Sequence, residues 1–92
     1  MRGKTYFEVI QAFLRKSRKK VANTHTENGK LYLFDNLIAE FRGNDLYITD
    51  AGWSTVTTKA RLNMLPNVNI KQISGTWYLN GIIWDGKWIK IN

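Results

Sequence analysis

The chain has 92 residues, a formal net charge of +7, 13% aromatic residues and no cysteine. This length predicts a single domain over residues 1–92, and the lack of cysteine excludes disulfides and thiolate metal sites. No apolar run reaches the roughly 18 residues that a membrane-spanning helix needs. The charge favours an acidic partner, either nucleic acid or an acidic protein surface, and we expect a cytoplasmic protein.

Residues 4–19 predict a first helix, because apolar side chains recur there at helical spacing. They are Tyr6, Phe7, Ile10, Phe13 and Leu14. Basic residues crowd the predicted end of this helix, namely Arg15, Lys16, Arg18, Lys19 and Lys20. The negative end of a helix dipole stabilises cations at this place. The basic cluster therefore has a structural explanation beside a functional one.

After this helix the apolar pattern takes a period of two, and turn dipeptides separate short apolar runs. We expect strands over residues 21–27, 31–34, 37–41 and 46–49, with turns at Asn28-Gly29, Asp35-Asn36 and residues 43–45. Tight turns join antiparallel neighbours, so these strands form a meander.

A short second helix is predicted over residues 59–64, with Thr57 or Thr58 as its N-cap and Pro66 after its end. Further strands follow at residues 68–71, 76–79, 82–84 and 87–91, with a hairpin turn at Asn80-Gly81. The fold class is α+β: an N-terminal helix packed on a small antiparallel β-sheet made of two β-meanders, with a short helix between them. Residues 31–38 and 77–83 are alike; a duplication is one explanation, and we favour recurrent hairpin chemistry as the other.

Catalytic chemistry has little support in the sequence. The only histidine, His25, lies in a polar segment without a nucleophile motif beside it. Four of the seven acidic residues fall in or beside predicted turns, and the glycines form no phosphate loop. We therefore expect no enzymatic activity, no cofactor and no bound metal.

Basic residues are the main binding candidates. The proposed nucleic-acid contacts are Arg15, Lys16, Arg18, Lys19, Lys20, Lys30, Lys59 and Arg61. A second candidate is an anion or stacking site at Trp53, Thr57 and Thr58, where a helix N-terminus and an indole ring would meet a ligand. The alternative for these three residues is a helix cap and a core tryptophan.

Several short segments resemble a pattern in short proteins of tailed bacteriophages. They are NTHT at 23–26, LYLF at 31–34, AGW at 51–53, TT at 57–58, RLN at 61–63 and WYLNG at 77–81. The resemblance implies a viral protein made in the bacterial host cytoplasm. It carries over no catalytic or binding residue.

The function expected from charge and resemblance together is nucleic-acid binding without sequence specificity. The alternative is a phage-encoded inhibitor that binds an acidic surface of a host or defence protein, for example a CRISPR-type protein. Small sheets of this kind expose edge strands that can pair with a second copy, so a homodimer is a further alternative.

Overall fold

A computed structural model describes residues 2–91, and describes side chains from residue 6 onward. The helices are α1 (Arg2–Leu14) and α2 (Val56–Leu62). The strands are β1 (Lys19–Val21), β2 (Thr24–Glu27), β3 (Lys30–Leu33), β4 (Asn36–Arg42), β5 (Asp45–Ile48), β6 (Ile70–Ile73), β7 (Thr76–Leu79), β8 (Ile82–Ile83) and β9 (Ile89–Lys90).

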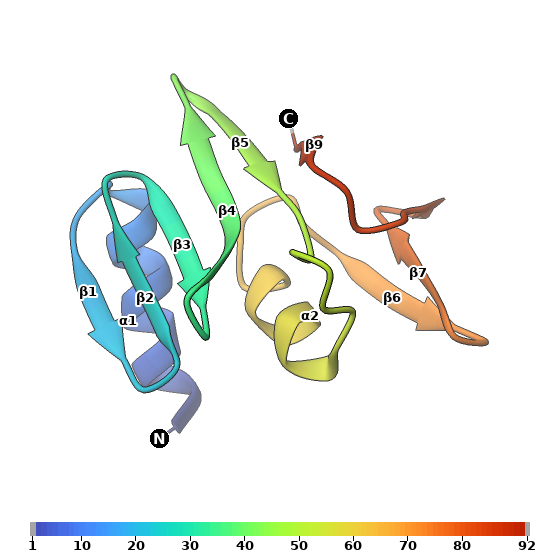
Figure 1. The fold of residues 1–92 in the computed structure, drawn as a ribbon, viewed down its shortest axis with the longest axis horizontal. Coiled ribbons are helices and arrows are strands. Elements are labelled where there is room, and N and C mark those ends of the chain that lie inside the picture. Colours follow the sequence, from blue (N-terminus) through green and yellow to red (C-terminus); the bar gives the residue numbers. More distant parts are fainter. Residues whose placement is uncertain (1, 92) are drawn as a thin grey trace.

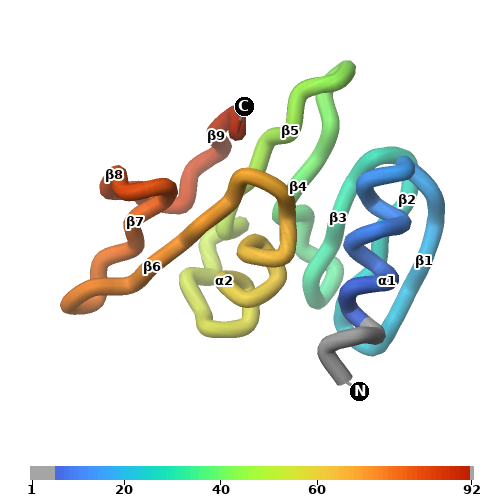
Figure 2. The backbone as a smooth tube through the Cα atoms, turned by 180° about the vertical axis from the view of Figure 1, so that it is seen from behind, coloured from blue at the N-terminus to red at the C-terminus, as the bar shows by residue number. Residues whose placement is uncertain are grey.

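The strands form two antiparallel sheets, and the predicted α+β class is confirmed. One sheet has the order β1-β2-β3-β4-β5-β9, and the other has the order β6-β7-β8. Helix α1 covers one face of β1, β2 and β3, while α2 lies between β4 and β6 (Figures 1 and 2). The two predicted meanders thus occupy separate sheets, and β9 brings the chain back to pair with β5 in the first sheet.

Helix α1 ends at Leu14, so the prediction that it continues to residue 19 was wrong. Lys16 adopts a left-handed conformation with φ 60°. Its N–H donates to Phe13 O at 2.9 Å, and the N–H of Ser17 donates to Ala12 O at 2.8 Å. This is a Schellman end, which closes a helix by bonding its last carbonyl groups. The basic residues therefore begin at the helix end and continue into β1, instead of filling the last turns.

The single strand predicted over residues 21–27 is two strands, β1 and β2, joined by a turn at Ala22-Asn23. Ala22 has φ 50°, and Val21 pairs with Thr24 across the turn. Alanine is an unusual residue at positive φ, because its Cβ crowds the following carbonyl. Pairing along β1 and β2 sets this turn, and the dipeptide itself gave no turn signal.

Helix α2 begins earlier than predicted. Thr55 is its N-cap: the Thr55 side chain accepts a hydrogen bond from Thr58 N at 3.2 Å. Thr57 and Thr58 lie inside the first turn, so the predicted N-cap was wrong. Any of several threonines satisfies the N-cap preference, which explains why the sequence alone misplaced it.

The two hairpins β2–β3 and β6–β7 have the same register, displaced by 46 positions. Thr24–Leu33, Glu27–Lys30 and Tyr32–Leu37 are paired in the first copy, as Ile70–Leu79, Ile73–Thr76 and Tyr78–Ile83 are in the second. Asn28-Gly29 and Ser74-Gly75 turn with positive φ at both residues, although only glycine is shared. Both explanations account for this agreement, because turn type and loop length set the register of a hairpin.

One hydrophobic core joins these elements. Its buried members include Val9, Ile10 and Phe13 of α1, Leu31, Ile38 and Ile48 of the first sheet, Leu62 of α2, and Trp77, Leu79 and Trp84 from the second copy. The core thus draws on both copies, and burial of its apolar area is the main stabilising term.

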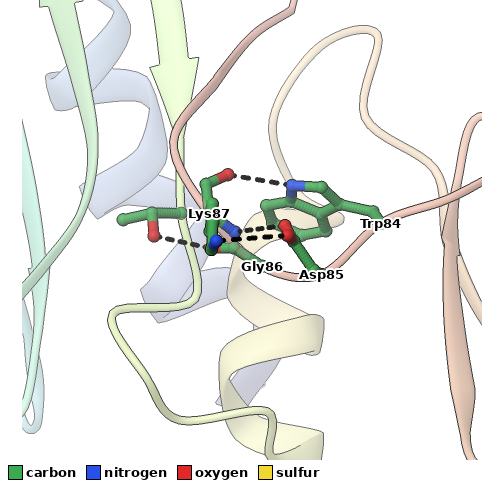
Figure 3. A network of polar contacts seen from close by, with 5 residues as sticks. Trp84, Asp85, Gly86 and Lys87 are labelled. Carbon is green, nitrogen blue, oxygen red and sulfur yellow. Dashed lines mark hydrogen bonds and ion pairs between the residues drawn. The ribbon is translucent and has the colours of Figure 1, made fainter.

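A loop of residues 84–87 connects the second copy to the first sheet (Figure 3). Trp84 Nε1 donates to Lys87 O at 2.9 Å, and Lys87 N donates to Asp85 Oδ1 at 3.0 Å. Thr49 Oγ1 donates to Gly86 O at 2.6 Å, which fixes the loop to the end of β5. The loop holds the chain in place before it enters β9.

Candidate nucleic-acid interface

Strand alternation separates the basic residues of β1. Thr24 and Thr26 of β2 are buried beneath α1, whereas His25 lies on the open face of the sheet. Lys20 pairs with His25 and so shares the open face. Lys19 pairs with Thr26 on the helix side, where its Nζ lies 3.6 Å from Glu8 Oε1. Adjacent lysines of one strand thus point to opposite faces of the sheet, although both border the hollow at its β1 edge.

Two further cations reach the open face. Arg18 Nε lies 3.8 Å from Glu27 Oε1, and Glu27 alternates with the buried Thr26. Lys30 pairs with Glu27 from β3 and is exposed. The open face therefore brings together Arg18, Lys20 and Lys30, three of the predicted contacts.

Aromatic rings lie among these cations. The rings of His25 and Tyr32 are stacked, with centroids 4.6 Å apart and an interplanar angle of 6°. His25 pairs with Tyr32 in the sheet, so the stack follows from register. His25 Nδ1 also lies 3.9 Å from Asp35 Oδ1, across the next turn. Flat rings beside cations are a common way to bind nucleic acid on a sheet.

The remaining predicted contacts lie elsewhere. Lys16 Nζ donates to Gly43 O at 3.2 Å and lies above the Phe41 ring. Arg61 Nε donates to Thr24 Oγ1 at 3.0 Å, and its guanidinium lies 3.5 Å from the Tyr6 ring centroid. These two cations are engaged in the fold itself. Arg15 lies by Phe7, Glu8, Gln11 and Lys19 on the outer side of α1, and Lys59 Nζ donates to Gln72 Oε1 at 3.2 Å beside the second sheet. The eight predicted contacts thus do not share one face.

One threonine of the second candidate, Thr58, is used within α2. The hydroxyls of Thr55 and Thr58 lie 3.1 Å apart, and Thr58 is buried. Trp53, in contrast, is 58% exposed, so its ring is accessible to a ligand. The Trp53 ring is thus exposed, whereas the Thr58 hydroxyl is committed to the helix cap.

Three adjoining hollows connect the basic end of β1 with Trp53. The first, of about 380 Å³, is lined by Arg18, Lys19, Lys20, His25, Thr26 and Glu27. The second, of about 320 Å³, is lined by Lys20, Ala22, Asn23, His25, Phe34 and Asp35. The third, of about 370 Å³, is lined by Leu33, Phe34, Asn36, Ile38, Asp50, Trp53, Thr55, Thr57 and Thr58. The first two hollows share Lys20 and His25, and the second and third share Phe34 at the turn between β3 and β4. We call the three hollows together the Lys20–Trp53 groove.

Phe34 lies at the middle of this groove, and the sequence reasoning missed it. The expected turn at Asp35-Asn36 is displaced by one residue, to Phe34 (φ 51°) and Asp35 (φ 65°). Phe34 consequently leaves the strand alternation and is 63% exposed. The aspartate was a turn signal, but an aromatic residue gives no reason to expect a left-handed turn position.

Within residues 2–91, no group of three histidine, aspartate or glutamate side chains that the structure describes could hold a metal ion. The described helices include none with the length and apolar character needed to cross a membrane.

Comparison with protein families gives one match. A family model described as Kyanoviridae Gp96 protein matches residues 2–91, almost the whole chain. The match bears out the resemblance to short proteins of tailed bacteriophages. Comparison with curated proteins and with solved structures finds no match.

Proposed function

The chain belongs to the Kyanoviridae Gp96 protein family of phages, and on that premise we propose that it binds nucleic acid without strong sequence preference. One observation carries the proposal: Arg18, Lys20 and Lys30 share the open sheet face with the stacked rings of His25 and Tyr32. Cations contact phosphates irrespective of sequence, and rings stack on any base. The net charge of +7 adds long-range attraction for a polyanion.

The ion pair on this face does not prevent phosphate binding. The Arg18 side chain is 83% exposed, and its contact with Glu27 is 3.8 Å long. Exposed pairs of this kind contribute roughly 0–1 kcal/mol, so a phosphate competes readily for the guanidinium. Each phosphate contact also releases counterions, which makes the affinity depend on salt concentration.

The proposal is tested by removing positive charge from the open face and, as a control, from elsewhere on the surface. In the triple variant R18A/K20A/K30A we expect weaker binding to single- and double-stranded DNA and RNA alike. The slope of log affinity against log salt should fall by about 2 for a single strand, at roughly 0.7 per phosphate. The variant K59A/K71A/K87A removes the same charge outside this face and should keep the native slope. Equal effects of the two triples, or no binding to any nucleic acid at about 50 mM salt, would refute the proposal.

A second function is favoured by an apolar patch at the other end of the molecule. Ile82 and Ile83 of the edge strand β8 are 72% and 66% exposed, and Ile89, which is 39% exposed, lines the same hollow as these two. Exposed apolar residues gathered at one place are typical of protein interfaces. We propose as the alternative that this patch, together with the basic surface, binds an acidic host or defence protein and inhibits it.

The two functions are separated by a pull-down from host lysate with nuclease treatment. A partner that is retained after nuclease, and is lost in I82K/I83K and weakened in R18A/K20A/K30A, supports the inhibitor. Loss of every partner on nuclease treatment supports nucleic-acid binding. Light scattering of the purified chain at several concentrations reports whether the same patch pairs two copies instead.

A further inference from the structure

We infer that the third hollow of the Lys20–Trp53 groove takes one unpaired nucleobase against Phe34 and Trp53, so that the nucleic-acid ligand is single-stranded. The inference rests on the proposed function and adds to it the strandedness and a base-binding residue, Phe34. Both rings are more than half exposed and both line the hollow of about 370 Å³. A volume of this size is at the lower end of ordinary small-ligand pockets.

The conformation of Phe34 is the first argument. A bulky residue with φ 51° is a genuine outlier, because left-handed backbone crowds the Cβ atom. The ring is 63% exposed, so burial does not compensate for this strain. Backbone strain that is not offset by packing in the core is often found at ligand sites. The strained turn therefore displays a large aromatic ring at the entrance of a pocket.

The second copy of the repeat is an internal comparison. Asn80 occupies the position equivalent to Phe34 and has the same φ of 51°. Its Oδ1 accepts from Asn69 N at 3.0 Å, and its Nδ2 donates to Asn67 O at 3.0 Å. Asparagine tolerates this conformation and bonds its neighbours locally. The same backbone thus accepts a favourable residue in one copy, while the first copy keeps an exposed phenylalanine.

Trp53 is held in place before any ligand arrives. The backbone N–H of Trp53 donates to the backbone carbonyl of Asp50 at 2.8 Å. The Asp50 carboxylate accepts from Gly52 N at 2.8 Å and from Ser54 Oγ at 2.6 Å. These bonds fix the backbone on both sides of the indole. A fixed loop loses little conformational freedom on binding, which favours affinity. Asn36 and Thr57 offer polar groups at the same hollow.

The path of the groove decides strandedness. The middle hollow shares Lys20 and His25 with the basic end and Phe34 with the base pocket. A backbone whose phosphates lie at Lys20 can thus direct a base into the third hollow. Bases of a duplex are stacked and paired, and must be unpaired to enter. The arrangement accordingly selects a single strand.

The test uses a single-stranded DNA of about 12 nucleotides with a central 2-aminopurine, and its duplex as comparison. On binding we expect a change of 2-aminopurine emission with the single strand and weaker binding of the duplex. Phe34→Asn should lower single-strand affinity by roughly tenfold, in line with the loss of one stacked base, and Trp53→Ala should act similarly. Phe7→Asn, at an exposed position on the outer side of α1, is the control and should bind as the native chain does.

A stability measurement separates a binding role from a structural one. Asparagine is favoured at φ 51°, so Phe34→Asn should keep or raise the thermal midpoint while it weakens binding. Native affinity and unchanged emission in both Phe34→Asn and Trp53→Ala would overturn the base pocket alone, if R18A/K20A/K30A still lowers the salt slope. Equal binding of single strand and duplex would also overturn it. Failure of the native chain to bind either probe would overturn the proposed function together with this inference.

Discussion

Gly86 is the position where we expect one added methyl group to lower the stability of the fold most. The residue has φ +87°, and a Cβ built on it would overlap Cγ and both carboxylate oxygens of Asp50. Asp50 is buried, and its side chain accepts hydrogen bonds from Gly52 and Ser54. Gly86→Ala therefore combines a backbone penalty with displacement of a bonded carboxylate. The loop of residues 84–87 and the loop that carries Trp53 meet at this contact.

The magnitude follows from these two parts. A left-handed conformation costs an alanine about 1–2 kcal/mol. Displacing the carboxylate weakens two hydrogen bonds to a charged group, each contributing roughly 1.5–3 kcal/mol when intact. We expect Gly86→Ala to lower the free energy of unfolding by about 3–5 kcal/mol. In a chain of this size that corresponds to a fall of the thermal midpoint by more than about 12 °C.

Gly81→Ala provides the control. Gly81 has the same φ of +87°, but nothing lies within 4 Å of a Cβ built there. This variant should lose only the backbone part, about 1–2 kcal/mol. Urea unfolding at 25 °C measures both, and an Asp50→Ala background completes a double-mutant cycle in which the extra cost of Gly86→Ala disappears. Equal losses in Gly86→Ala and Gly81→Ala would refute the argument.

Three smaller effects follow from the hydrogen bonds. Arg61→Ala should lower the free energy of unfolding, measured by urea titration, by about 1–2 kcal/mol, since Arg61 is bonded within the fold. It should leave nucleic-acid affinity unchanged. Weaker binding of this variant would show that Arg61 contacts the ligand. Thr55→Ala should cost about 1 kcal/mol while Thr57→Ala costs less than half of that, and the reverse order would contradict the observed cap. Trp84→Phe should cost about 1 kcal/mol through loss of the bond to Lys87 O, and unaltered stability would show that bond to be unimportant.

Local turn chemistry was the most reliable guide to the fold. Asn28-Gly29 and Asn80-Gly81 both turn where they were expected, because these residues favour positive φ without help from elsewhere. The turn at Ala22 was missed and the turn expected at Asp35-Asn36 begins one residue earlier, at Phe34, since neither Ala22 nor Phe34 favours that conformation. Their geometry is imposed by pairing along the neighbouring strands, which the sequence of the turn itself does not record.

The sequence predicted only part of the geometry of the candidate site, again because strand pairing decides the rest. The cluster of residues 15–20 was visible as charge, but the sequence did not show that α1 ends at Leu14. Once β1 begins at Lys19, alternation sends Lys19 and Lys20 to opposite faces. A shift of one residue in the pairing of β1 with β2 would exchange the faces on which Lys19 and Lys20 lie. Charge composition thus predicts a class of partner, whereas register decides which cations meet it.

The two copies differ at the edge of their hairpins. In the second copy, Asn63 Oδ1 accepts from Ile70 N at 2.6 Å, and Asn63 Nδ2 donates to Ile70 O at 3.1 Å. One side chain thus bonds the edge of β6 at the residue equivalent to Thr24, which in the first copy pairs with β1. A basic strand therefore stands where the second copy has a single asparagine. Since β1 carries Lys20 and borders the groove, the first copy has the basic strand and the strained Phe34 together, and a ligand that binds as we propose would contact both.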